Sequence, residues 1–268
     1  MANVDVHGHR WHLLDEGDGP VVLLIHGFPF DHSMWDAQRR ALRDRYRVII
    51  PDLRGFGRSG SATDPVSIPQ WADELAMLLD AAGVNTPVTV CGLSMGGCIA
   101  LSFAQKYATR MSGLMLCDMR SVGESPEGKA TRLKMAERVL AEGATVAAEA
   151  MLPRLFGPKT NEDHPEIVDH VRNLILTTSP RSIAAGQHAL ANRPDFTSFL
   201  PTISMPTLVI VGEHDAISSA SEMKATAEAI PGAEFVSIAN AGHLAPMENA
   251  VAVNAALETF LKRTAVRS

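Results

Sequence analysis

The sequence predicts an α/β protein with a mostly parallel β-sheet, helices on both faces and a helical insertion. Three observations lead to this prediction. Short apolar runs rich in Val and Ile recur along the chain, segments with helical spacing separate them, and one long stretch carries the helical pattern alone. Strands that alternate with helices are typical of a parallel sheet with right-handed crossovers. A chain of 268 residues is long enough to bury one large core.

The predicted strands lack polar alternation, which is typical of strands buried on both faces of a sheet. A first pair within residues 4–14 turns at Gly8. Further strands are predicted at residues 21–25, 48–50, 88–91, 114–117, 208–211 and 234–238. Between two of these strands, Trp71 and Leu75 mark the apolar face of a helix that begins after Ser67, a typical N-terminal cap.

The alternation of strands and helices stops in the middle of the chain. No strand-like run appears between residues 120 and 193, whereas apolar residues such as Leu133 and Ala136 recur there at helical spacing. Strand patterns resume after this stretch. We therefore predict a core formed by residues 1–119 and 194–268, with residues 120–193 as a helical cap on the sheet.

Composition and charge exclude several classes of protein. The net charge is −6 and no basic run occurs, so binding to nucleic acid through phosphates has no electrostatic support. No apolar run approaches the roughly 18 residues that a membrane span needs. The first residues lack the basic and apolar regions of a secretory signal. Three cysteines, an odd number, favour a reducing cytoplasm over a disulfide framework. The composition is compatible with a monomer or a homo-oligomer.

A candidate nucleophile lies in the segment Gly-Leu-Ser-Met-Gly at residues 92–96. The pattern G-x-S-x-G is weak alone, but here a predicted strand precedes it and a run of small residues typical of a helix start follows it. Glycines at both ends allow strand and helix to meet in a tight turn that exposes the serine oxygen above the sheet edge. The sequence therefore predicts Ser94 as a nucleophile.

A serine hydroxyl needs a base, and the base needs an orienting carboxylate. His243 follows the last predicted strand and is the candidate base. Asp215 follows the strand before it and is the candidate acid, with Glu213 and Asp118 as alternatives near strand ends. The order Ser94, Asp215, His243 is the nucleophile–acid–base order of a serine hydrolase built on such a sheet.

The segment His-Gly-Phe-Pro at residues 26–29 supplies the remaining part of this site. Pro29 disfavours helical backbone at Phe28, which leaves the Phe28 N–H free to point inward. We expect this N–H and that of Met95 to stabilise an oxyanion. His26 is expected to be structural, holding the backbone of the loop.

Together these motifs resemble the α/β-hydrolase fold family over nearly the whole chain. The segments that carry the resemblance are residues 26–29, Asp-Leu-Arg-Gly-Phe-Gly-Arg-Ser at 52–59, the serine turn, Gly-Glu-His-Asp at 212–215 and Gly-His at 242–243. The sequence is most similar to the group of carboxylesterases and 3-oxoadipate enol-lactonases. The resemblance implies an eight-stranded sheet and a hydrolase that needs no metal or organic cofactor. Dehalogenases and epoxide hydrolases of this fold have aspartate where this chain has Ser94.

We interpret the sequence as a carboxylesterase that cleaves small esters through an acyl-enzyme. A 3-oxoadipate enol-lactonase or another lactonase is the main alternative; a carbon–carbon bond hydrolase and a ligand receptor with vestigial hydrolysis are further ones. The partner is then a small ester or lactone.

Residues that contact the substrate are harder to predict than the triad. Aromatic residues make up only 5% of the chain, so we expect a pocket of aliphatic and Met side chains. Phe28, Trp35 and Arg138 are the candidates. Arg120 and Arg138 could bind an anionic substrate, but a position on a solvated helix face is the simpler interpretation of both arginines. The histidines at positions 7, 9 and 12 complete no metal-ligand pattern, and we predict no metal site.

Overall fold

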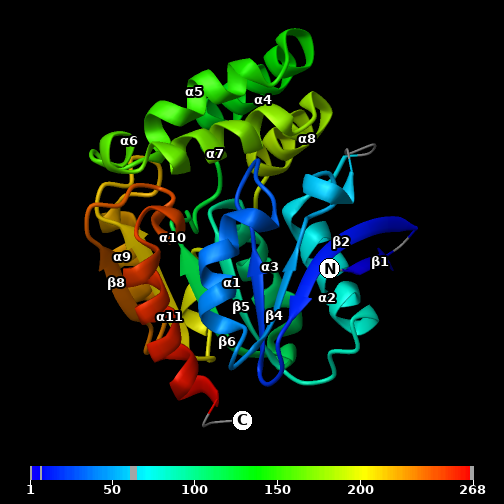
Figure 1. Ribbon diagram of the computed structural model, residues 1–268, viewed down its shortest axis with the longest axis vertical. Coiled ribbons are helices and arrows are strands. Elements are labelled where there is room, and N and C mark those ends of the chain that lie inside the picture. The colour runs from blue at the N-terminus through cyan, green and yellow to red at the C-terminus, as the bar shows by residue number, and fades with distance from the viewer. Residues whose placement is uncertain (1, 7, 61–64, 266–268) are drawn as a thin grey trace.

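The computed structural model describes residues 2–6, 8–60 and 65–265. One eight-stranded sheet runs through it in the order β1-β2-β4-β3-β5-β6-β7-β8 (Figure 1). Its strands are β1 (Ala2–Val6), β2 (His9–Glu16), β3 (Val21–Ile25), β4 (Arg47–Pro51), β5 (Val88–Leu93), β6 (Met111–Cys117), β7 (Thr207–Gly212) and β8 (Glu234–Ile238). The predicted α/β class is thereby confirmed.

The direction of the strands determines which loops lie at the same edge of the sheet. β1 and β2 pair antiparallel to each other, and β2 pairs antiparallel to β4, while all other neighbours are parallel. The carboxyl ends of β3, β5, β6, β7 and β8 therefore meet at one edge of the sheet. Every residue of β3, β5 and β7 is buried, which explains their unbroken apolar patterns.

Helices cover both faces of the sheet. α1 (Asp36–Leu42) packs with α11 (Ala250–Ala265) on one face, and α2 (Ile68–Ala81) packs with α3 (Met95–Tyr107) on the other (Figure 1). α9 (Ala220–Ala229) packs on β7 and β8. As predicted, α2 buries Trp71 and Leu75, and the Ser67 side chain accepts a hydrogen bond from the Gln70 N–H at its start.

Five helices between β6 and β7 lie over the carboxyl edge of the sheet (Figure 1). They are α4 (Pro126–Glu142), α5 (Thr145–Leu155), α6 (Thr160–Asp163), α7 (Pro165–Thr177) and α8 (Pro180–Ala191). All five fall within the segment 120–193, and we call them the cap. Thr178 Oγ1 donates a hydrogen bond of 2.9 Å to the Pro29 carbonyl, which ties the end of α7 to the loop after β3.

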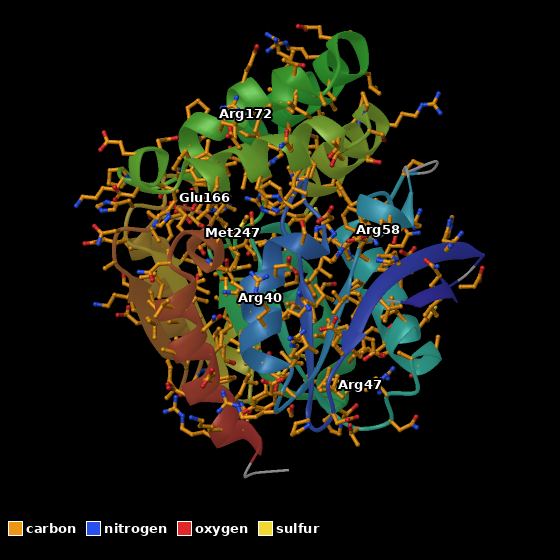
Figure 2. All side chains as sticks on the ribbon, in the orientation of Figure 1. Arg40, Arg47, Arg58, Glu166, Arg172 and Met247 are labelled. Atoms are coloured by element: carbon orange, nitrogen blue, oxygen red, sulfur yellow. The ribbon has the colours of Figure 1, made fainter. Side chains whose placement is uncertain are left out.

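Side chains fill the space between the sheet, the flanking helices and the cap (Figure 2). Arg172 lies on the cap, whereas Arg47, at the start of β4, lies at the opposite end of the sheet and pairs with Asp15 at 2.7 Å. Within the described ranges, every helix is too short or too polar to cross a membrane.

Candidate active site

Ser94 occupies a sharp turn between β5 and α3. Its backbone has φ 53° and ψ −111°, in a region that L-residues rarely adopt. Two glycines make this turn possible, because a Cβ on Gly92 would overlap the Gly96 carbonyl and a Cβ on Gly96 would overlap the Ile25 carbonyl. The turn therefore requires both glycines of the G-x-S-x-G segment, and it places Ser94 above the carboxyl edge of the sheet.

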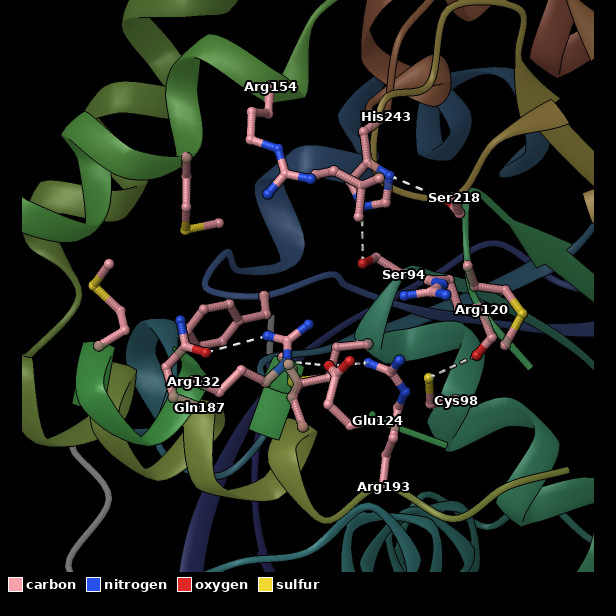
Figure 3. Close-up of a pocket in the computed structure, with 18 of the residues that line it drawn as sticks. Ser94, Cys98, Arg120, Glu124, Arg132, Arg154, Gln187, Arg193, Ser218 and His243 are labelled. Carbon is pink, nitrogen blue, oxygen red and sulfur yellow. Dashed lines mark hydrogen bonds and ion pairs between the residues drawn. The ribbon is translucent and has the colours of Figure 1, made fainter. Parts of the chain in front are cut away.

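A chain of hydrogen bonds runs from Ser94 through His243 to Asp215. Ser94 Oγ lies 2.9 Å from His243 Nε2, and His243 Nδ1 lies 2.8 Å from Asp215 Oδ2 (Figure 3 shows Ser94 and His243). His243 and Asp215 are both buried. When the Nδ1–H donates to the carboxylate, Nε2 is left as the acceptor for the serine hydroxyl. The arrangement can thus move a proton from Ser94 to His243.

Further donors surround the Asp215 carboxylate. Oδ1 accepts the N–H groups of Ile217 and Ser218 at 2.7 and 3.0 Å, and Oδ2 accepts the Ser218 hydroxyl at 2.5 Å. Burial raises the pKa of Asp215, but the hydrogen bonds from His243 and Ser218 outweigh it, so this pKa lies below its ordinary value. Asp215 therefore stays ionised. Ser218 was not predicted from sequence, although its place three residues after the acid is a usual one for a side chain that caps a loop.

The two expected oxyanion donors come from the carboxyl ends of two neighbouring strands, β3 and β5. Phe28 follows β3, and Met95 is the first residue of α3. Among the described residues, neither of these backbone N–H groups donates a hydrogen bond. Both N–H groups are therefore available to a substrate oxygen, and the start of α3 adds a positive dipole end.

The alternative acids are engaged elsewhere. Asp118 is fully buried, and its Oδ1 accepts the Gly212 N–H at 2.7 Å. Burial, followed by the charge of Asp215, raises the pKa of Asp118 well above its ordinary value. Glu213 accepts the Asn240 N–H at 3.2 Å. Of the three candidate acids, Asp215 is the one whose carboxylate accepts the hydrogen bond from His243 Nδ1.

The expected structural role of His26 agrees with its contacts. The ring is completely buried, with Nδ1 2.8 Å from the Gly27 carbonyl, and Nε2 accepts the Leu53 N–H at 3.0 Å. It thereby fixes the loop after β3, which carries Phe28, against the loop after β4.

Comparison with known proteins identifies the family. The alpha/beta hydrolase fold family matches residues 20–250, most of the chain. The protein belongs to the α/β-hydrolase family. Among curated proteins it is similar to 3-oxoadipate enol-lactonase 2 of Acinetobacter baylyi, with 29% identity over 249 residues, 92% of this chain and 91% of that protein.

Solved structures of α/β hydrolases agree with this fold. A thermophilic esterase from Thermogutta terrifontis, solved with malate bound, has a TM-score of 0.95 and 44% identity, covering 98% of each chain. The enol-lactonase from Burkholderia xenovorans LB400 has a TM-score of 0.90 and 30% identity, covering 97% of this chain and all of the other. Both an esterase and a lactonase are thus structural relatives of this hydrolase.

A cavity of about 370 Å³ in this hydrolase opens beside Ser94 and His243. Phe28 and Met95 line it, as do apolar side chains that include Met119, Met135, Met151, Leu155, Leu190 and Ile217. The expected aliphatic and Met side chains are present, but they are not the whole lining. The lining also holds a glutamate and four arginines, namely Glu124, Arg120, Arg132, Arg154 and Arg193.

The structure corrects two predicted substrate-binding residues. Neither Trp35 nor Arg138 belongs to the described lining of the cavity. Trp35 is completely buried at the end of a short 3₁₀ turn, His32–Trp35, and packs in the core. Arg138 lies on the solvent side of α4, where it pairs with Glu142 one helical turn later. Of the three candidates, only Phe28 reaches the cavity.

One cluster outside the cavity has atoms of the type that metals prefer. Candidate ligand atoms of His12, His32 and Asp52 all lie within 4.8 Å of one another. The carboxylate of Asp52 is already occupied, because Oδ1 accepts the backbone N–H and lies 2.7 Å from the ring Nδ1 of His32, and Oδ2 accepts the Arg58 N–H. Three donors thus engage the Asp52 carboxylate, so contacts within the protein account for the position of this side chain. His7 lies outside the described residues.

Proposed function

We propose that this hydrolase cleaves carboxylic esters of small molecules through an acyl-enzyme on Ser94. The observation that carries the proposal is the hydrogen-bonded chain from Ser94 Oγ to His243 and Asp215, which opens onto a cavity of substrate size. The similarity to an esterase over nearly the full chain supports it.

In the first half of the reaction, Ser94 Oγ attacks the ester carbonyl while His243 Nε2 takes its proton. Asp215 holds the ring in the required tautomer and stabilises the imidazolium that forms. The carbonyl oxygen gains negative charge and is stabilised by the N–H groups of Phe28 and Met95. His243 then returns the proton to the leaving alcohol, and the acyl group remains on Ser94.

The second half releases the acyl group. Water enters the cavity, His243 removes a proton from it, and the resulting attack on the acyl carbon frees the acid and restores Ser94. None of these steps requires a metal or an organic cofactor.

Lactone hydrolysis is a second candidate, favoured by the similarity to two enol-lactonases. A lactone is a cyclic ester, so the same attack opens the ring and the leaving alcohol stays attached to the acyl group. We also propose a cytoplasmic location, supported by Cys91, Cys98 and Cys117, all of which are free thiols.

The test combines labelling and turnover. A fluorophosphonate phosphonylates activated serines. We expect it to add one phosphonyl group to the peptide that contains Ser94, as measured by mass spectrometry. Ser94→Ala should take no label and should lose about 10⁴- to 10⁶-fold in kcat on 4-nitrophenyl acetate while keeping its fold. Label on another residue, or near-normal hydrolysis by the variant, would refute the serine mechanism. A ligand receptor of this fold would instead release one equivalent of nitrophenol and stall.

A further inference from the structure

Two guanidinium groups in the cavity wall have nitrogens without an acceptor. Among the described residues, Arg193 Nη2 and Arg120 Nε are buried and unpartnered. Arg193 is itself only 7% exposed. A buried guanidinium N–H that lacks an acceptor loses its hydration without compensation, which is costly, so such groups generally indicate a polar partner that is absent.

The neighbouring contacts leave this part of the cavity positively charged. Glu124 Oε2 accepts hydrogen bonds from Arg132 Nε at 2.5 Å and from Arg193 Nη1 at 3.0 Å, so one carboxylate serves two guanidinium groups (Figure 3). Burial raises the pKa of Glu124, but the bond from Arg132 and the charge of Arg193 outweigh it, so this pKa lies below its ordinary value. Glu124 is thus ionised and cancels only one of the positive charges.

Arg120 adds a further positive charge to the same wall. Its Nη2 pairs with Glu222 at 3.0 Å, but the side chains of Arg120 and Glu222 are 36% and 46% exposed, so solvent screens that pair. The Arg120 carbonyl accepts from Cys98 Sγ at 3.6 Å, and Cys98 lies one turn of α3 beyond Ser94. The loop that carries Arg120 is therefore held beside the helix that begins at the nucleophile.

From this geometry we infer that Arg193 and Arg120 form a subsite for a second, ionised carboxylate of the substrate. The preferred substrates are then small monoesters of dicarboxylic acids, or lactones with a carboxylate arm. This inference rests on the proposed function, since it assigns the substrate class of the same site. A planar guanidinium can bind a carboxylate through two parallel hydrogen bonds. Arg132 and Arg193 each donate one bond to Glu124 Oε2, so Arg193 Nη2 is left to bind a further carboxylate.

The experiment compares two esters that differ in one charge. Methyl hexanoate and monomethyl adipate have similar length, but only the adipate ester ends in a carboxylate. The parent is expected to prefer the adipate ester by at least about tenfold in kcat/KM, the size of effect of a charged hydrogen bond. Succinate should inhibit competitively, more strongly than inorganic phosphate at equal concentration.

Variants assign the preference to residues. Arg193→Gln and Arg120→Gln should each lower the ratio of the two kcat/KM values by about 10- to 100-fold. Arg120 lies on a partly exposed loop, so its variant tests the subsite even if Arg193→Gln does not fold. Arg138→Gln is the matched control: it removes an arginine from the same segment, outside the cavity, and should leave both kcat/KM values unchanged.

The possible outcomes distinguish a failure of the proposed subsite from a failure of the proposed hydrolysis. Ser94-dependent hydrolysis of both esters without preference for the adipate ester would overturn the subsite and leave the proposed function standing. A preference that survives in both arginine variants would also overturn it. Inhibition by phosphate as strong as that by succinate would overturn the assignment to a carboxylate. Absence of any Ser94-dependent hydrolysis would overturn the proposed function itself.

Discussion

The Glu248 carboxylate joins the His243 loop to Gly157 in the cap. Its Oε2 accepts the Gly157 N–H at 2.6 Å and the Thr160 hydroxyl at 2.5 Å, while Oε1 accepts the N–H groups of Gly242 and Leu244 at 2.9 and 3.1 Å. The residues bonded by Oε1 flank His243 directly. Glu248 thus fixes the backbone on both sides of the histidine and connects it to the segment between α5 and α6.

We predict that Glu248→Gln destabilises the protein and slows turnover. The amide NH₂ of glutamine faces N–H or O–H donors at one of the two oxygen positions, so those donors lose their acceptor. The expected loss in free energy of unfolding is about 2 to 4 kcal/mol, with kcat falling more than KM changes because His243 is less well held. Thr160→Val is the control, since it removes only one cap contact and should cost about 1 kcal/mol. Urea denaturation and steady-state kinetics measure both quantities. Equal effects of the two variants on kcat would contradict this role for Glu248.

The acid of the site can be identified by two matched amides. Asp215→Asn should leave His243 in the wrong tautomer and lower kcat about 10⁴-fold, because an amide can donate to the ring nitrogen that must itself donate. Asp118→Asn should change kcat less than about tenfold, since Asp118 bonds Gly212 and not the ring. Steady-state kinetics on one ester decide between them. The reverse pattern would move the acid to the strand that ends at Cys117.

Asp118→Asn should also stabilise the protein in a pH-dependent way. The pKa of Asp118 in the folded protein is raised, so its contribution to stability is complete below the ordinary pKa near 4 and is lost as the pH rises towards the folded value. An amide avoids that loss, keeps the bond to the Gly212 N–H, and suits the left-handed backbone at φ 45°. We expect a gain in the free energy of unfolding at pH 7 that shrinks towards pH 4. Thermal unfolding over this pH range measures it, and a gain that does not change with pH would show that burial of charge is not its cause.

Ser218→Ala tests the hydrogen bonds around Asp215. Removing the hydroxyl takes away a donor that keeps the Asp215 pKa low, so that pKa rises towards its ordinary value. A lowered pKa contributes stability that is present above the unfolded value and is lost as the pH falls through the folded value. The variant should therefore unfold at a higher pH than the parent when the solution is acidified. At neutral pH its free energy of unfolding should be lower by about 1 kcal/mol. Acid titration followed by circular dichroism measures the shift, and superimposable curves would argue against it.

The sequence was sufficient to predict the sheet, and Ser94, His243 and Asp215, which it named as candidates, lie in that order within hydrogen-bond distance of one another. Strands buried on both faces leave unbroken apolar runs, and the conformation of the serine turn requires glycine at positions 92 and 96. The order of strands then brings Ser94, Asp215 and His243 to one edge, because parallel strands share the direction of their carboxyl ends. Local chemistry and topology therefore determine this part of the site.

The cavity wall could not be read from the sequence in the same way. Arg132 and Arg138 both lie on α4, yet one faces the cavity and the other pairs with Glu142 in solvent. The side of α4 that faces inward is decided by its packing on α8, and helical spacing alone does not fix which arginine lies there. Trp35 similarly lies close in sequence to Phe28, which lines the cavity, but packs in the core.

The backbone conformation of Ser94 lowers the free energy of unfolding of the whole chain. A residue held at φ 53° and ψ −111° costs of order 1 to 3 kcal/mol, and domains of this kind are stable by only about 5 to 15 kcal/mol in total. The exposed position of the Ser94 hydroxyl thus costs a sizeable share of the free energy of unfolding. Directed evolution for thermostability will tend to relax this turn unless activity is selected at the same time, because the strain and the exposure of the hydroxyl have the same structural origin.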